Sequence, residues 1–102
     1  MTGTTVEQSK EMGQSGARPR RRDGVVSQVA DDEAVLLDIE SGKYFSLNPV
    51  GSRIWELCDG NRSASEIVAV ICDEFDVAAD VASADTAEIL DDLRRERLLA
   101  EE

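Results

Sequence analysis

Residues 36–60 carry the strongest structural signal in this chain and read LLDIESGKYFSLNPVGSRIWELCDG. Two short apolar segments flank Ser41-Gly42, which is typical of a β-hairpin. Asn48-Pro49 then predicts the start of a helix, because Asn is a good N-cap and Pro fits the first helical position. Asp59-Gly60 indicates the end of that helix. The stretch therefore predicts a hairpin that runs directly into a helix.

The length of the hairpin loop can be deduced from where the apolar side chains fall. A two-residue loop would put Phe45 beside a charged residue. We prefer a three-residue loop, residues 40–42, because it pairs Ile39 with Lys43 and gathers the apolar side chains on one face. Gly42 then takes the left-handed conformation that such loops require. The predicted apolar face holds Val35, Leu37, Ile39, Phe45 and Leu47.

The rest of the chain supplies one more strand and two more helices. Val25 to Val29 is rich in β-branched residues and predicts a first strand. Ser63 to Glu66 fits a capping box that opens a second helix. A third helix is expected to begin between residues 79 and 83 and to run to about Arg97. The predicted domain, residues 23–102, is α+β and winged helix-turn-helix-like, with a three-stranded antiparallel sheet followed by three helices.

Residues 1–22 have no periodic apolar face, so we predict a disordered N-terminal tail. Its arginine cluster is interpreted as solvated, with an anchor for an acidic partner as the alternative. The formal charge is −11, and nineteen of the 22 acidic residues lie after residue 23, so the body of the protein should repel nucleic acid. Because the chain lacks an apolar span and a signal peptide, we expect a cytoplasmic protein without membrane contact.

The residue types that usually carry catalysis are missing or unfavourably placed. The chain has no histidine, which excludes His-based triads and His metal ligands. It also has no glycine-rich phosphate loop. Cys58 and Cys72 are expected to be small buried apolar side chains, with a disulfide or a metal site as the less favoured alternative. We therefore expect a non-enzymatic binding module with no catalytic residue, metal or cofactor.

A three-stranded meander leaves two unpaired edges, and the third strand, Lys43 to Asn48, can form one of them. A free edge can capture a peptide as an added strand, with backbone hydrogen bonds giving affinity and pockets giving selectivity. The alternative is a winged-helix protein that binds DNA or acts as an adaptor, although its reading helices would be acidic. A third reading is an obligate subunit whose edge strand pairs with a partner chain or with itself.

The hairpin-to-helix block at residues 36–60, together with positions in the two later helices, resembles the PqqD-like family. Members of this family are the recognition elements for ribosomally made, post-translationally modified peptides (RiPPs). The resemblance covers roughly residues 24–99 and is most specific in the hairpin-to-helix block. The matching positions are Leu37-Asp38, Ser41 to Phe45, Leu47-Asn48, Gly51, Ile54-Trp55, Leu57, Asp59-Gly60, Ile67-Val68, Phe75 to Val77, Asp85, Ile89 to Leu93 and Leu98-Leu99.

The resemblance implies a protein that binds the leader segment of a precursor peptide and presents it to a separate maturation enzyme. That enzyme would be a leader peptidase, a cyclase or a radical SAM protein. The leader would add to the third strand, in a groove beside the third helix. Stand-alone chains of this size resemble PqqD proteins or lasso-peptide B1 proteins, of which we favour the lasso type, and we expect a monomer or weak dimer. The implied peptide-binding residues are Lys43, Tyr44, Phe45, Ser46, Leu47, Asp85, Glu88, Ile89, Asp92, Leu93 and Glu96.

One position departs from the family pattern, which often has a glycine where this chain has Arg97. Because a left-handed conformation is costly for a residue with a side chain, we expect the third helix to run longer or to end differently.

Several of the apolar residues in the resemblance can also be explained as ordinary core residues without a binding role. These residues are Phe45, Leu47, Ile54, Trp55, Ile89 and Leu93.

Overall fold

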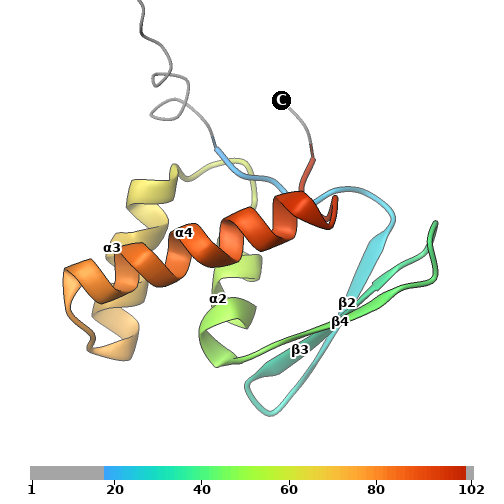
Figure 1. Ribbon diagram of the computed structural model, residues 1–102. Coiled ribbons are helices and arrows are strands. Elements are labelled where there is room, and N and C mark those ends of the chain that lie inside the picture. The colour runs from blue at the N-terminus through green and yellow to red at the C-terminus, as the bar shows by residue number, and fades with distance from the viewer. Residues whose placement is uncertain (1–17, 101–102) are drawn as a thin grey trace, which may run out of the picture.

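The computed structural model describes residues 18–100, and Figure 1 shows a sheet that projects beside three helices. No helix within these residues is long and apolar enough to cross a membrane. The predicted fold class, a three-stranded antiparallel sheet followed by three helices, is confirmed. The elements in chain order are β2 (Val25–Ala30), β3 (Glu33–Asp38), β4 (Tyr44–Leu47), α2 (Pro49–Leu57), α3 (Ala64–Phe75) and α4 (Ala79–Arg95).

The strands lie in the order β2-β3-β4, so β3 is central and the other two are edges. In the β3–β4 hairpin Leu36 lies opposite Phe45. The loop spans residues 39–42 and is closed by the Asp38 N–H, which donates to the Lys43 carbonyl at 3.0 Å. The predicted three-residue loop is therefore wrong by one residue. Gly42 does adopt the left-handed conformation that was predicted, with φ of 76°.

The one-residue difference follows from Asp38. Its side chain lies on the inner face of the sheet, and the residue is only 6% exposed because Arg22 pairs with it there. The sequence prediction instead placed Val35, Leu37 and Ile39 on that face. Two of them, Val35 and Ile39, are instead 43% and 58% exposed on the outer face. A charged residue with a partner close by has thus set the register.

The predicted caps of the first two helices are confirmed. Asn48 Oδ1 accepts a hydrogen bond from the Gly51 N–H at 2.7 Å, and a proline begins α2. At the start of α3, Ser63 and Glu66 each accept from the other's backbone N–H, at 3.2 and 2.8 Å. These bonds satisfy N–H groups that the first turn of a helix leaves free.

The three helices and the inner face of the sheet enclose one core. Cys58 lies fully inside it, and Cys72 packs against it from a half-buried position, so their predicted packing role is confirmed. Ile54 and Trp55 are also core residues. The buried apolar residues are Ala34, Leu36, Ile54, Trp55, Leu57, Cys58, Ile67, Ile71, Ala82, Leu90, Leu93, Leu98 and Leu99.

Helix α4 ends at Arg95 in a turn of the kind that glycine usually closes. Arg97 is left-handed, with φ of 61°. The Leu98 N–H donates to the Leu93 carbonyl at 2.8 Å, and the Arg97 N–H donates to the Arg94 carbonyl at 3.0 Å, which are the bonds of a Schellman motif. The expectation of a longer or different helix end is therefore wrong. Burial of Leu93 and Leu98 offsets the strain, which is about 1 kcal/mol.

Residues 18–22, here called the strap, belong to the fold. The strap lies between the end of α2 and residues 98–100 and hydrogen-bonds to both. Arg21 donates to the carbonyls of Trp55 and Glu56, at 2.9 and 2.8 Å, and its guanidinium lies over the Trp55 ring. The predicted tail therefore extends too far, because these arginines occupy helix carbonyls that composition alone cannot anticipate. The rest of that prediction, residues 1–17, lies outside the described residues.

Candidate functional site

The edge strand β4 presents two different faces. Phe45 and Leu47 point inward, where they pack partly buried against the core. Tyr44 and Ser46 point outward and are exposed, and the Tyr44 residue is 69% exposed. Lys43 immediately precedes the strand and by alternation shares the inner side with Phe45. The inner side of β4 is therefore apolar along the strand and charged at the hairpin end.

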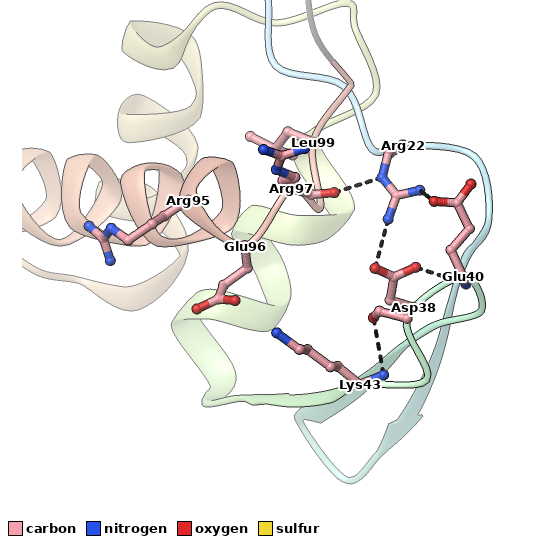
Figure 2. A pocket seen from close by; sticks show the side chains of 9 residues that line it. Arg22, Asp38, Glu40, Lys43, Arg95, Glu96, Arg97 and Leu99 are labelled. Atoms are coloured by element: carbon pink, nitrogen blue, oxygen red, sulfur yellow. Dashed lines mark hydrogen bonds and ion pairs between the residues drawn. The ribbon is translucent and has the colours of Figure 1, made fainter.

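A cleft of about 640 Å³ opens between the hairpin and the C-terminal end of α4. Figure 2 shows Lys43 from the hairpin and Glu96 from the end of α4 pointing toward one another across it. In the same view Arg22 extends from the strap toward Asp38 and Glu40 of the hairpin. The residues that line this cleft are Arg22, Asp38, Glu40, Ser41, Lys43, Arg95, Glu96, Arg97 and Leu99.

Arg22 fixes the positions of the segments around the cleft. Its guanidinium contacts the Asp38 carboxylate at 2.9 Å and the Glu40 carboxylate at 3.7 Å. Its Nε donates to the Arg97 carbonyl at 2.6 Å, just beyond the end of α4. One side chain thus joins the strap, the hairpin and the helix end, as the dashed lines in Figure 2 show.

The Arg22 hydrogen bond lowers the pKa of the Asp38 carboxyl below its usual range. The Glu40 N–H adds to the effect by donating to Asp38 Oδ1 at 3.1 Å. Donors that stabilise the carboxylate keep it ionised, and the ionised form holds the arginine in place. Asp38 is therefore a structural anion of the cleft at neutral pH.

The residues that were predicted to form the α4 wall of the leader groove map to one stripe of the helix. Asp85, Ile89, Asp92 and Glu96 follow one another at spacings of three or four residues, so they share a side. Ile89 is partly buried and the acidic members are exposed. Leu93 is only 2% exposed and can support this wall only from beneath.

Of the implied binding residues, the cleft itself brings together Lys43 and Glu96. The remaining ones lie farther along β4 and α4. The sequence prediction missed the other seven lining residues, including Arg22, Asp38 and Arg97. The sequence did contain an indication for Asp38. A charged residue at the end of a strand requires an oppositely charged partner if its side chain faces the core. The arginine run of the strap was the candidate partner.

The cleft is lined by seven charged side chains together with Ser41 and Leu99, and by no histidine or cysteine. Cys58 is buried in the core, and burial raises its pKa to about 12. Such a thiol stays protonated and is a poor nucleophile. Within residues 18–100, no group of three metal-ligating side chains is close enough to hold a metal ion.

Comparison with known families and curated sequences gives one match. A family model described as Coenzyme PQQ synthesis protein D (PqqD) matches residues 33–99, which is most of the described chain. Among curated protein sequences, none matches significantly.

Three solved structures share the fold. TbiB1, in complex with the TbiA(beta) leader peptide, is 40% identical, with a TM-score of 0.73 over 81% of this chain and 96% of that one. A lasso peptide synthetase B1 complexed with the leader peptide is 25% identical, with a TM-score of 0.73 over 83% and 100%. The PqqD part of Methylobacterium extorquens PqqCD, described as a stand-alone RiPP recognition element, is 26% identical, with a TM-score of 0.67 over 81% and 88%.

Proposed function

Because the chain belongs to the PqqD family, we propose that it is a non-catalytic recognition protein for the leader segment of a ribosomally synthesised precursor peptide. One observation carries the proposal. Among residues 18–100, β4 is an edge strand that no other strand covers, and it runs to an open cleft in a fold of which two solved relatives hold leader peptides. The two leader-bound relatives are covered over 96% and 100% of their length, which supports the lasso type.

The leader binds by adding a strand to β4. In the β3–β4 ladder the Asp38 N–H bonds Lys43, so by alternation the backbone groups of Lys43, Phe45 and Leu47 face β3. Those of Tyr44 and Ser46 face the free edge. An added strand therefore pairs with the backbone of these two residues, while its side chains meet the inner side of β4 and the flank of α4.

The groove beside β4 supplies selectivity. Phe45, Leu47 and Ile89 keep part of their surface accessible while packing on the core, so they provide an apolar floor. Asp85, Glu88 and Asp92 are exposed on α4 and favour basic leader residues. Exposed ion pairs of this kind contribute only about 0–1 kcal/mol each, so the apolar contacts and the backbone ladder carry most of the affinity.

The second partner is a separate maturation enzyme, which fits the description of the PqqD relative as a stand-alone recognition element. The leader peptidase, cyclase or radical SAM class follows from the kind of precursor that the leader belongs to. Neither the comparisons nor the charge of α3 and α4 favours DNA binding, since both helices expose acidic residues.

The proposal is tested by fluorescence anisotropy with two labelled peptides, the TbiA(beta) leader and the leader encoded beside the gene of this chain. We expect saturable binding of at least the second, with a Kd of about 1 μM or tighter, and no binding of a random DNA duplex. Sedimentation of the free protein should give a monomer or a weak dimer. Absence of leader binding, together with DNA binding or a stable dimer, would refute the proposal.

A pair of proline substitutions tests the strand-addition geometry. Ser46→Pro removes an N–H from the free edge of β4, whereas Ser27→Pro removes one from the free edge of β2. We expect Ser46→Pro to weaken leader binding by about tenfold or more, which is roughly 1.4 kcal/mol, and Ser27→Pro to leave it unchanged. Equal affinities for the two variants, both folded by circular dichroism, would place the leader elsewhere. Ser46→Ala, which keeps the N–H, serves as the matched control.

A further inference from the structure

The charge along the groove changes sign near the hairpin. Three of the exposed side chains on α4 that precede the cleft are acidic: Asp85, Glu88 and Asp92. The cleft itself is lined by four basic residues and three acidic ones. In a chain with a formal charge of −11, this is a local reversal. A peptide that follows β4 therefore passes from an acidic wall to a basic end.

Two of the four cations in the cleft already have partners. Arg22 forms an ion pair with Asp38 of the hairpin at 2.9 Å. Arg95 is paired with Asp92 at 2.7 Å and points away from the hairpin in Figure 2. Lys43 and Arg97 form no ion pair with any of residues 18–100. Of the four cations in the cleft, these two are therefore the ones that can pair with a bound anion.

The end of α4 does not cancel that charge. The last carbonyls of a helix carry partial negative charge and normally repel an anion. Here the Arg94 carbonyl accepts from the Arg97 N–H at 3.0 Å, and the Arg97 carbonyl accepts from Arg22 Nε at 2.6 Å. Because these oxygens are occupied by donors, an anion can approach the helix end.

The turn that ends α4 places Arg97 beside the cleft. Its φ of 61° belongs to the Schellman motif, and the residue lines the cleft. The Arg97 side chain is exposed, so it can turn toward a bound chain on a fast timescale.

We propose that the hairpin end of the groove selects a leader with an acidic side chain at that end, and that Lys43 and Arg97 read its charge. The inference rests on the proposed leader binding. It adds that the charge pattern of the leader is fixed relative to β4, with basic residues favoured along α4 and an acidic one at the hairpin. The same pattern then sets which way the leader runs.

Glu96 distinguishes charge recognition from a purely structural role of the cleft residues, because the two predict different effects on leader affinity when its charge is removed. Its carboxylate points toward Lys43 across the cleft, although the two side chains are too far apart to form an ion pair. It therefore competes with an acidic leader residue for the same cation. Removing the charge of Glu96 should therefore strengthen binding of an acidic leader. Removing the charge of Lys43 or Arg97 should weaken it.

The test is a charge scan on the peptide combined with charge removal on the protein. The probe is the labelled leader that binds the wild type, with Glu, Gln or Lys placed at each position in turn. The protein variants are Lys43→Gln with Arg97→Gln, Glu96→Gln, and Arg94→Gln as the matched control. Arg94 carries the same charge in the last turn of α4, three residues before Arg97, but does not line the cleft. Affinities are measured by anisotropy at low and at physiological salt.

The expected result is one peptide position at which the wild type binds Glu about fivefold more tightly than Lys, a preference that falls with salt. The double variant loses this preference, Glu96→Gln increases it, and Arg94→Gln leaves it unchanged. A leader that binds with no position preferring Glu, or a preference that persists in the double variant, overturns the inference and leaves the proposed function standing. No binding of any leader peptide overturns both.

Discussion

Arg22 and Arg53 make similar contacts in different places, and the difference shows what an ion pair contributes to this protein. Arg22 contacts Asp38 at 2.9 Å, and the Asp38 side chain is 9% exposed. Arg53 contacts both oxygens of Glu74, at 2.8 and 2.9 Å, but the two side chains are 35% and 40% exposed. By geometry alone Arg53 has the better pair. By burial, Arg22 does.

What the two arginines join differs as well. Arg53 links α2 to α3, which the core already holds together through buried residues such as Ile54 and Ile67. Arg22 links the strap, the hairpin and the end of α4, which meet around the open cleft. The Arg53 pair therefore adds to a contact that already exists, whereas the Arg22 pair defines the shape of the candidate site. Ion pairs of equal distance can thus differ in both stability and function.

The largest expected effect is that of Arg22→Ala. The change leaves the buried Asp38 carboxylate without its partner, so we expect the free energy of unfolding to fall by about 2–3 kcal/mol. Leader affinity should fall as well, because the hairpin and the helix end lose their common contact. Urea denaturation and leader anisotropy measure the two effects. Arg22→Lys should restore stability only in part, since an ammonium cannot make the same set of directed bonds.

A variant Arg22→Ala that loses stability but binds the leader with wild-type affinity would break the comparison. The arginine would then be a structural residue like Arg53, and the cleft would not depend on it. The double variant with Asp38→Asn separates the two cases, because it removes the unpaired charge while leaving the segments unlinked.

The next effect is the dependence of stability on pH. Arg22 lowers the pKa of Asp38, and Arg53 lowers the pKa of Glu74. Each carboxyl binds its proton more readily in the unfolded chain, where the pKa is about 4, so stability is present above that pH and is lost as pH falls toward the folded pKa. We expect urea midpoints between pH 6 and 2.5 to decline, and Asp38→Asn to flatten the decline more than Glu74→Gln. The reverse order would mean that the exposed pair is the stronger one.

The same contrast explains which parts of the fold the sequence could predict. The caps at Asn48 and Ser63 are local, because each side chain bonds a backbone group three residues away. Local chemistry of this kind can be read directly from spacing. The register of the hairpin is not local. It depends on Asp38 facing inward toward Arg22, and the two residues are sixteen positions apart.

The candidate site was predictable to a similar extent. The edge strand followed from the meander, and its residues followed from the family resemblance. The full lining of the cleft did not, because it includes Arg22, which the strap brings there by hydrogen-bonding alongside residues 98–100. Arg97 was expected to change the helix end and instead adopts the glycine-like conformation. A single residue's preference was outweighed by the burial of Leu93 and Leu98 on either side of it.

A smaller effect is expected from Arg97→Gly, and it sharpens the role of Arg22. Relief of the left-handed strain should raise the free energy of unfolding by roughly 0.5–1 kcal/mol, after the greater flexibility of glycine in the unfolded chain is subtracted. If the Arg22 bond to the Arg97 carbonyl helps to hold this conformation, Arg97 can relax once Arg22 is removed, so the gain should be smaller in the Arg22→Ala background. Thermal unfolding of the four proteins gives the coupling. Equal gains in both backgrounds would show that the Schellman motif holds the turn without Arg22.

The smallest effect is expected from Arg53→Ala. Both partners of the pair with Glu74 are substantially exposed, so water screens the charges and the free energy of unfolding should fall by only about 0.2–0.5 kcal/mol. Leader affinity should stay within about twofold of the wild type, because Arg53 does not line the cleft. High salt should remove most of the stability difference, whereas it should remove less of the Arg22→Ala difference. A loss above about 2 kcal/mol, or a clear loss of leader binding, would show that exposure and position do not separate the two arginines.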